Sequence, residues 1–387
     1  MNLRDYKTSK ARREAIEKLT GKSFVAVGGN ILKEDSVLNR NIENMIGAVQ
    51  IPLGIAGKLK IKGDKAKGEF FIPLATSEGA LVASVNRGCK AVSESGGTRV
   101  MVENVGVTRG PVFQTEGIYQ SRNLKTWAYD HFDDVSRISG QTSSHIKLQN
   151  FDAEIVGNLV YFRFVFDTMD AMGMNMVTKA SAAIVKYIEE MTGTVCLSVA
   201  GNFDIDKKPA WLNSICGRGK KVWAEVVLSE KILKETLKTD AESFYKVWLS
   251  KCMIGSALSG SLGFNSHFAN IIAAIFLATG QDAAHITEGS LGITTTEIIE
   301  KKSLYVSVYL PDLMIGTVGG GTGLPAQKEA LSILGIPDPK LKEGEQVLKF
   351  AEIIAGAVLA GEISLLASLS EGSLAKAHER LGRGKRI

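Results

Sequence analysis

The sequence predicts an α+β protein in which a small α/β domain is inserted into a larger mixed domain. Residues 111–198 alternate between strand-like and helix-like segments, in the strand–helix–strand order of a compact α/β unit. The flanking sequence is strand-like and punctuated by glycine before this region, and helical and rich in Gly, Ala and Ser after it. Because 387 residues allow two or three domains, we expect three parts. They are an N-terminal helical domain (1–46), the large domain (47–110 and 198–387) and the insert (111–197).

The expected elements follow the hydrophobic pattern along the chain. The first 45 residues are charged and helix-forming, and the segments IPLGIAGKLKIKG and GEFFIPLA then predict strands, with helical spacing after Glu78. Within the insert, YFRFVFDTMDAMGMNM predicts a strand and a turn that lead into the helix VTKASAAIVKYIEEM. The most hydrophobic part, residues 259–284, predicts a long helix buried among others. Residues 351–387 predict a final helix with the basic tail GRGKRI.

The composition excludes a disordered or collagen-like chain, because 45% hydrophobic and 22% charged residues provide material for a sizeable core. The net charge of +5 suits an anionic small molecule at least as well as nucleic acid. The four cysteines form no CxxC pair, which indicates free thiols in a reducing compartment and no zinc site. No signal-peptide pattern is found, and the apolar stretches Ala269–Thr279 and Ile353–Ala360 are shorter than a membrane span of roughly 20 residues. We therefore expect a soluble, cytoplasmic protein without a metal.

Four polar residues stand where the local pattern does not require them. Glu78 follows an apolar strand at the start of a helix, where a carboxylate by itself is typical of a helix N-terminus. Lys207 lies in a turn before a proline, the usual place of a solvated lysine. Asp282 follows a long apolar run, so we expect it to have a cationic partner, because burying an unpaired carboxylate is costly. His378 lies near the end of the last predicted helix, where a histidine by itself acts as a capping charge.

Two glycine-containing loops are candidates for binding phosphate. No GxGxxG follows a strand and no GxxxxGK[ST] occurs, so neither a dinucleotide-binding fingerprint nor a P-loop is present. Instead, DAMGMNM (Asp170–Met176) stands at a strand-to-helix junction, and GTVGGGTG (Gly316–Gly323) is a flexible loop. Each can bring backbone N–H groups to a phosphate at the start of a helix, although such loops are common.

Eight segments together resemble the catalytic portion of 3-hydroxy-3-methylglutaryl-CoA (HMG-CoA) reductase, and class I, the biosynthetic class, more closely than the degradative class II. They occur in order over nearly the whole chain: ENMIGAVQIPLGIAG, LATSEGALVASVNRGCKAV, VTRGPV, DAMGMNMVTKA, DKKPAWLNSICGRGK, FNSHFANIIAAIFLATGQDAA, IGTVGGGTGLPAQ and LAGEISLLASLSEGSLAKAH. The resemblance implies reduction of HMG-CoA to mevalonate and CoA by two hydride transfers from a nicotinamide cofactor. It also implies a ferredoxin-like insert, a large domain around a long central helix with Asn265–Thr279 as the candidate, and a dimer or dimer-based tetramer with interfacial active sites.

The resemblance implies a role for each of the four polar residues. Lys207 would stabilise the oxyanion, and His378 would protonate the CoA thiolate. Glu78 would donate protons in the aldehyde steps, and Asp282 would be the buried partner that holds Lys207 and Glu78. The substrate-binding positions are Arg109, Asn202, Lys208, His267 and Asn270. Two departures from the family leave alternatives open, because Ala200 replaces a usual serine and Asp204-Ile205 a usual Cys-Thr: HMG binding is weakened, or Asp204 reshapes the loop.

The resemblance also implies a cofactor site. Its positions are Asp170, Met172, Gly173, Met174, Asn175, Val318, Gly319 and Gly320. The adenosine 2′-phosphate would be read from the segment QTSSHIKLQ, by Ser143, Ser144, His145 and Lys147. This segment has no acidic residue to bind a free ribose diol, so NADPH is favoured over NADH.

Two other functions compete with this interpretation. One is an NAD-dependent degradative reductase that oxidises mevalonate, and the other is a non-catalytic acyl-CoA-binding relative. Retention of Lys207, Glu78, Asp282 and His378 argues against the second, because a pure binder needs no proton donor for a thiolate. Nucleic-acid binding by the basic tail is the weaker interpretation of that segment, and no membrane partner is expected.

Overall fold

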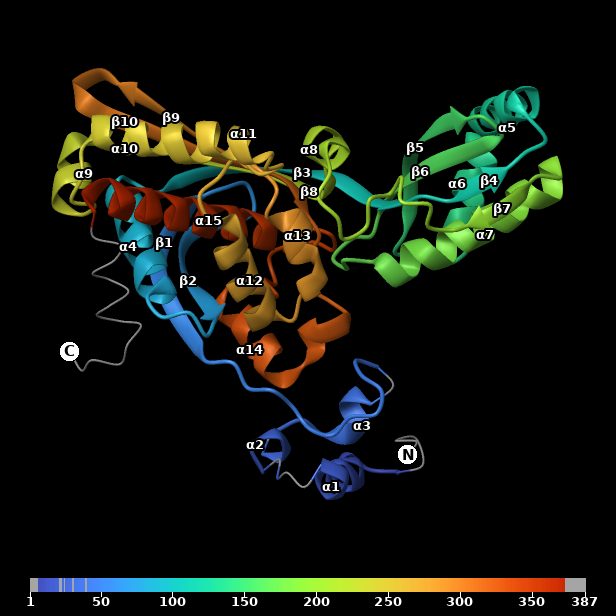
Figure 1. Cartoon of the computed structure of the whole chain (residues 1–387), viewed down its shortest axis with the longest axis horizontal. Coiled ribbons are helices and arrows are strands. Elements are labelled where there is room, and N and C mark those ends of the chain that lie inside the picture. The colour runs from blue at the N-terminus through green and yellow to red at the C-terminus, as the bar shows by residue number, and fades with distance from the viewer. Residues whose placement is uncertain (1–5, 21–22, 24, 30, 39, 373–387) are drawn as a thin grey trace.

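The computed structural model describes residues 6–372 apart from 21, 22, 24, 30 and 39, and it has the α+β fold that the sequence predicts. Figure 1 shows a large unit, a smaller unit at its right-hand end, and the N-terminal helices below the large unit. The N-terminal helices are α1 (Ser9–Thr20), α2 (Val25–Gly28) and α3 (Glu34–Val37). Two separate clusters of buried apolar residues, one in each unit, form the main cores.

The large unit combines six strands with a layer of helices. Its strand order is β2-β1-β3-β8-β10-β9, and α4 follows β2 as the helical spacing after Glu78 predicts. The strands are β1 (Leu53–Lys62), β2 (Lys67–Ala75), β3 (Thr98–Arg109), β8 (Arg218–Leu228), β9 (Ile293–Ile299) and β10 (Ser303–Leu313). The helices are α4 (Leu81–Glu94), α8 (Trp211–Cys216), α9 (Glu230–Glu235), α10 (Ala241–Trp248), the π-helical turn Leu249–Gly255, α11 (Ser256–Ser259), α12 (Phe268–Thr279), α13 (Ile286–Gly289), α14 (Pro325–Ile333) and α15 (Gln346–Glu371). Short 3-10 turns span Ala283–His285, Glu300–Lys302 and Gly320–Gly323.

The smaller unit has the ferredoxin-like arrangement. Its chain order is strand–helices–strand–strand–helix–strand, and its antiparallel sheet has the order β7-β4-β6-β5. Its elements are β4 (Val112–Gln114), α5 (Ile118–Asp130), α6 (Phe132–Gly140), β5 (Lys147–Val156), β6 (Leu159–Asp167), α7 (Met174–Thr192) and β7 (Val195–Ser198). Phenylalanines from β4, β5 and β6 fill its core.

Strand β3 connects the two units. Its residues 99–106 pair with β8 in the large unit, and its last three residues, Val107–Arg109, pair with β6 of the smaller unit. β3 therefore ends, and β8 begins, at the junction between the units (Figure 1). This places Arg109 and Arg218 at the junction.

The long central helix is α15, so the sequence-based choice of Asn265–Thr279 is wrong. That segment forms the 12-residue α12, which ends at Gly280 in the left-handed conformation. α15 has 26 residues and packs against β3, β8, β10, α4 and α12. The buried carboxylates Glu352 and Glu362 interrupt its apolar run, which is why its hydrophobic stretch looked short. By length and composition α15 also passes as a membrane span, but 83% of its most apolar window is buried inside the fold.

Candidate active site

Lys207 and Asp282 form an ion pair, with Nζ 2.8 Å from Oδ2, so Asp282 has the cationic partner that the sequence predicts. Asp282 is not fully buried as expected: its side chain is 35% exposed, because it follows α12 where the chain opens toward a cavity. Burial raises the pKa of Asp282, but hydrogen bonds from Lys207 and from the Ala284 N–H outweigh this and hold the pKa below its ordinary value. Asp282 therefore stays an anion and keeps the ammonium of Lys207 in place.

The loop that carries Lys207 is held in an unusual backbone conformation. Asn202, Ile205 and Lys207 have φ values of 65°, 52° and 59°. Residues other than glycine rarely adopt this left-handed backbone conformation. The backbone N–H of Lys207 donates to Glu288 Oε1 at 2.8 Å, and Lys208 Nζ folds back onto the carbonyl of Asp206. Such conformations persist only where surrounding contacts determine them, and Glu288 supplies one of these contacts.

Asp204 is a buried part of this loop and contacts Arg109, while its effect on HMG binding stays a prediction. Its side chain is buried, and its Oδ2 lies 3.3 Å from Arg109 Nη1, while Asp206 Oδ2 lies 3.7 Å from the same nitrogen. Burial raises the pKa of Asp204 above its ordinary value, although the charges of Arg109 and Arg218 act in the opposite direction. Arg109, predicted to bind substrate, is thus already engaged by two carboxylates of the loop.

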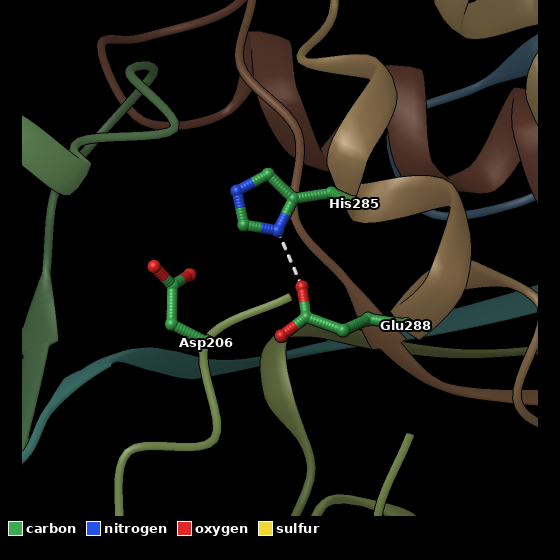
Figure 2. A group of neighbouring side chains, drawn as sticks. All are labelled: Asp206, His285 and Glu288. Carbon is green, nitrogen blue, oxygen red and sulfur yellow. Dashed lines mark hydrogen bonds and ion pairs between the residues drawn. The ribbon is translucent and has the colours of Figure 1, made fainter. Parts of the chain in front are cut away.

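A buried ionic cluster lies beneath the loop, and the sequence analysis missed it. The fully buried Arg218 donates to Glu288 Oε1 at 2.6 Å and to Asp206 Oδ1 at 3.0 Å. Figure 2 shows the imidazole of His285 directed at Glu288, with Asp206 opposite, and His285 Nδ1 hydrogen-bonds Glu288 Oε2. These three side chains are close enough to resemble a metal-ligand set. We assign no metal to them, because the guanidinium of Arg218 already bonds both carboxylates. The i, i+3 spacing in HITE was the available signal for this cluster.

Glu78 and Asn270 face a neighbouring cavity. Asn270 Nδ2 donates to Glu78 Oε2 at 3.0 Å, and both line a cavity of about 630 Å³. Lys207 and Asp282 line another of about 650 Å³, and Leu277 of α12 borders both. Within the described part of the chain, no hydrogen bond or ion pair joins Glu78 to Asp282, so the expected direct link is not present in this single chain.

The start of α12 is tied to α15 through a buried carboxylate. Glu362 accepts hydrogen bonds from the backbone N–H groups of Ser266 and His267, at 2.8 and 2.7 Å, and from Thr294 Oγ1 at 2.7 Å. His267 Nε2 donates to the carbonyl of Gly361 at 2.9 Å. These contacts determine the positions of His267 and Asn270 at the start of α12. Nothing in the sequence indicated that Glu362 contacts this segment.

The two phosphate-binding candidates come together in space. An isolated β-bridge joins Ala171 to Val318, and Met172, Gly173, Met174, Asn175, Val318, Gly319 and Gly320 line the cavity that contains Lys207. A side chain at Gly316 would collide with the backbone nitrogen of Met172, which explains the glycine. Asp170 points elsewhere: its carboxylate accepts from the Gly344 and Val347 N–H groups near the start of α15.

The predicted 2′-phosphate segment has an acidic neighbour that its sequence does not contain. Ser143, Ser144 and His145 precede β5, and Lys147 begins it. His145 Nδ1 lies 2.7 Å from Glu343 Oε1, which comes from the loop before α15, and both side chains are mostly exposed. The absence of an acidic residue, on which the preference for NADPH rested, therefore holds for the local sequence and not for the fold. His378 lies outside the described residues.

The chain is similar to hydroxymethylglutaryl-coenzyme A reductases in sequence and in fold. The sequence model of the hydroxymethylglutaryl-coenzyme A reductase family matches residues 8–383. The 3-hydroxy-3-methylglutaryl-coenzyme A reductases of Aeropyrum pernix and Pyrococcus abyssi are 51% and 50% identical to this chain, over 96% of it and 89% and 92% of their own lengths. Reductase 3 of Oryza sativa subsp. japonica is 40% identical, over 97% of this chain and 67% of its own. The class II reductase of Streptococcus pneumoniae, solved bound to NADPH in open conformations, shares the fold, with a TM-score of 0.67 and 19% identity over 94% of this chain and 97% of its own.

Proposed function

Because the chain belongs to the hydroxymethylglutaryl-coenzyme A reductase family, we propose that it reduces HMG-CoA to mevalonate and CoA, with two molecules of NADPH and two protons consumed. The observation that carries the proposal is the Lys207–Asp282 pair in the cavity lined by both glycine-containing loops. A cation that lines a cavity together with two candidate phosphate-binding loops suits a reaction in which a carbonyl oxygen gains negative charge.

The proposed chemistry uses Lys207 twice. Each hydride transfer turns a carbonyl carbon tetrahedral and its oxygen into an alkoxide, first in the thioester and then in the aldehyde. The ammonium of Lys207 stabilises that oxygen, and Asp282, which remains ionised, keeps the ammonium charged and oriented. Glu78, held by Asn270, is proposed as the proton donor of the aldehyde steps. Its separate cavity implies that substrate spans the border at Leu277.

His378 is proposed to protonate the departing CoA thiolate. The first reduction produces a thiohemiacetal, whose collapse releases a thiolate and forms the aldehyde. An imidazolium suits this step, because histidine exchanges its proton near neutral pH. The second reduction releases no thiolate, so it does not require this proton.

The cofactor site is proposed at the start of α7 and along the Gly316–Gly323 loop. NADPH, when bound, supplies the hydride for both reductions. The 19-residue α7 begins at Met174, and Met174 and Asn175 line the cavity, so the N-terminus of this helix, where an anion is favoured, lies at the cavity edge. A side chain at Gly319 or Gly320 would meet nothing within 4 Å, which leaves this wall open to a ligand. We propose that Asp170 acts indirectly, by holding its loop against the start of α15.

Selection of NADPH over NADH is proposed to come from Ser143, Ser144, His145 and Lys147. One structural neighbour is bound to NADPH, which agrees with this choice. The contact between His145 and Glu343 must open for His145 to reach a phosphate. Glu343 therefore opposes the preference without removing it, because Lys147 and two serine hydroxyls remain available.

We also propose that the chain forms a dimer or a dimer-based tetramer. The strongly exposed apolar side chains of Trp211, Ile215 and Leu258 support this, since a second subunit would remove them from water. The domain boundaries proposed are 1–46, 47–110 with 198–387, and 111–197. Size-exclusion chromatography with light scattering tests the oligomer, and a monomeric mass at micromolar concentration would contradict it.

The central experiment replaces Lys207 by alanine. We expect turnover of both HMG-CoA and mevaldehyde to fall at least about 100-fold, the usual cost of removing an oxyanion donor, while NADPH still binds. Lys186→Ala, a change of an exposed lysine on α7, is the matched control. More than a tenth of wild-type activity in Lys207→Ala would contradict the proposed role.

A further inference from the structure

We propose that His285 is a positioning residue of this site. It lies between Asp282 and Glu288 and so restrains the position of the Lys207–Asp282 pair. The inference rests on the proposed function and adds a residue that neither the sequence motifs nor the proposed chemistry uses. It begins from the cluster in Figure 2.

The contacts around His285 form an almost closed ring. The side chain is fully buried, and its Nδ1–H donates to Glu288 Oε2. Glu288 Oε1 accepts from the backbone N–H of Lys207 at 2.8 Å. The side chain of Lys207 returns to Asp282, 2.8 Å away. Asp282 Oδ2 lies 3.8 Å from His285 Nε2, and this gap is the one open link.

His285 Nε2 is a buried polar atom without a hydrogen-bond partner among the described residues, and Asp282 is the carboxylate that it faces. A buried polar atom left unpaired is unfavourable, so a small approach of the Asp282 side chain would be stabilising. Such an approach carries Lys207 Nζ with it, because the ammonium is bonded to the same oxygen. This circle of contacts therefore couples the position of the Lys207 ammonium to the buried cluster of Arg218, Glu288 and Asp206.

Charged groups surround the imidazole of His285. Its Nδ1 is engaged by Glu288, so Nε2 is the atom left to contact Asp282. The charged groups that face it are the carboxylates of Asp282, Glu288 and Asp206 and the cations of Arg218 and Lys207; the buried Asp312 lies near Glu288 and Arg218. Arg218 bonds two of these carboxylates, which leaves Asp282 to face Nε2 of His285.

Two conservative variants separate positioning from packing. Asparagine places its amide near the position of Nδ1 and keeps the bond to Glu288, whereas glutamine reaches the position of Nε2 and keeps the bond to Asp282. If His285 acts through Asp282, His285→Asn should lose at least tenfold in kcat with both HMG-CoA and mevaldehyde, with KM for NADPH within twofold. His285→Gln should retain several times more kcat than His285→Asn. A misplacement of about 1 Å is enough for such a loss.

The control is Ala283→Ser, which changes an exposed residue of the same turn and should leave kcat unchanged. If His285→Asn does not fold, His285→Gln still decides, because it should keep more than a tenth of the wild-type kcat with KM for NADPH within twofold. Equal kcat in both variants and wild type, or a better asparagine than glutamine variant, would overturn the proposal.

Two further outcomes are distinct. Loss of wild-type activity with a chelator and recovery with Zn²⁺ would make Asp206, His285 and Glu288 metal ligands and overturn the positioning role. A wild-type protein that does not reduce HMG-CoA with NADPH would refute the proposed function itself. An active wild type with an unaffected His285→Asn would refute only this inference.

Discussion

Replacing Glu343 by glutamine should increase the preference for NADPH over NADH. In the structure Glu343 Oε1 holds His145 Nδ1 at 2.7 Å, so a bound 2′-phosphate must compete with this carboxylate for the imidazole. The substitution keeps the size of the side chain and removes its charge. It therefore frees His145 for the phosphate and removes a repulsion from it.

The size of the effect follows from the exposure of the pair. The two side chains are 58% and 63% exposed, and contacts between polar side chains as exposed as these are worth about 0.2–1 kcal/mol, or roughly 1.4- to 5-fold in affinity. We therefore expect kcat/KM for NADPH to rise by about this factor in Glu343→Gln. The value for NADH should stay level, or fall if Glu343 accepts a bond from the ribose diol.

The assay is steady-state reduction of saturating HMG-CoA, with each cofactor varied in turn at low ionic strength. Glu190→Gln is the matched control, since Glu190 is an exposed glutamate on α7 that pairs with a lysine one turn away. Ser144→Asp adds a carboxylate beside the phosphate and should shift the preference toward NADH. An unchanged or lower ratio of NADPH to NADH efficiency in Glu343→Gln would refute the reasoning.

Three more predictions concern catalysis, packing and pH. His378→Gln should lose about 100-fold or more in turnover of HMG-CoA but much less with mevaldehyde, because only the first reduction releases a thiolate; equal losses on both substrates would contradict this role. Gly88→Ala should lower stability by about 2 kcal/mol or more in thermal unfolding, because the added methyl group would collide with the carbonyl oxygen of Ala360 on α15. The control is Gly117→Ala, whose added methyl group would meet nothing, and an equal melting temperature in both variants would count against the reasoning. Burial lowers the pKa of Lys220 to about 8 from an ordinary 10.5, so the unfolded state binds more protons between these values. Stability should therefore rise from pH 8 to 10.5 by up to about 3 kcal/mol more than in Lys220→Met, and parallel denaturation profiles would refute the shift.

The local pattern of hydrophobic residues was sufficient to predict most elements of the fold. The strands β1 and β2, the helix after Glu78 and the α/β insert follow from hydrophobic periodicity, which acts over neighbouring residues. The central helix was misplaced for a physical reason. Glu352 and Glu362 make its sequence look polar, yet both are buried and bonded, Glu352 by the backbone of the turn between β1 and β2 and Glu362 by the start of α12. Hydrogen-bond partners so far away in the sequence cannot be inferred from periodicity.

The same distinction holds for the candidate site. The sequence by itself determined the family, the two glycine-containing loops, and Asp282 as a residue that needs a cationic partner, because these are properties of short motifs. Only the tertiary structure decided that Asp204 engages Arg109, that Glu343 reaches His145, and that His285 lies between Asp282 and Glu288. Each of the first two contacts joins segments that are distant in sequence, and the third joins near neighbours whose side chains are turned inward by the burial of α13. Charge pairing depends on distances of a few ångströms in space, and the fold sets those distances.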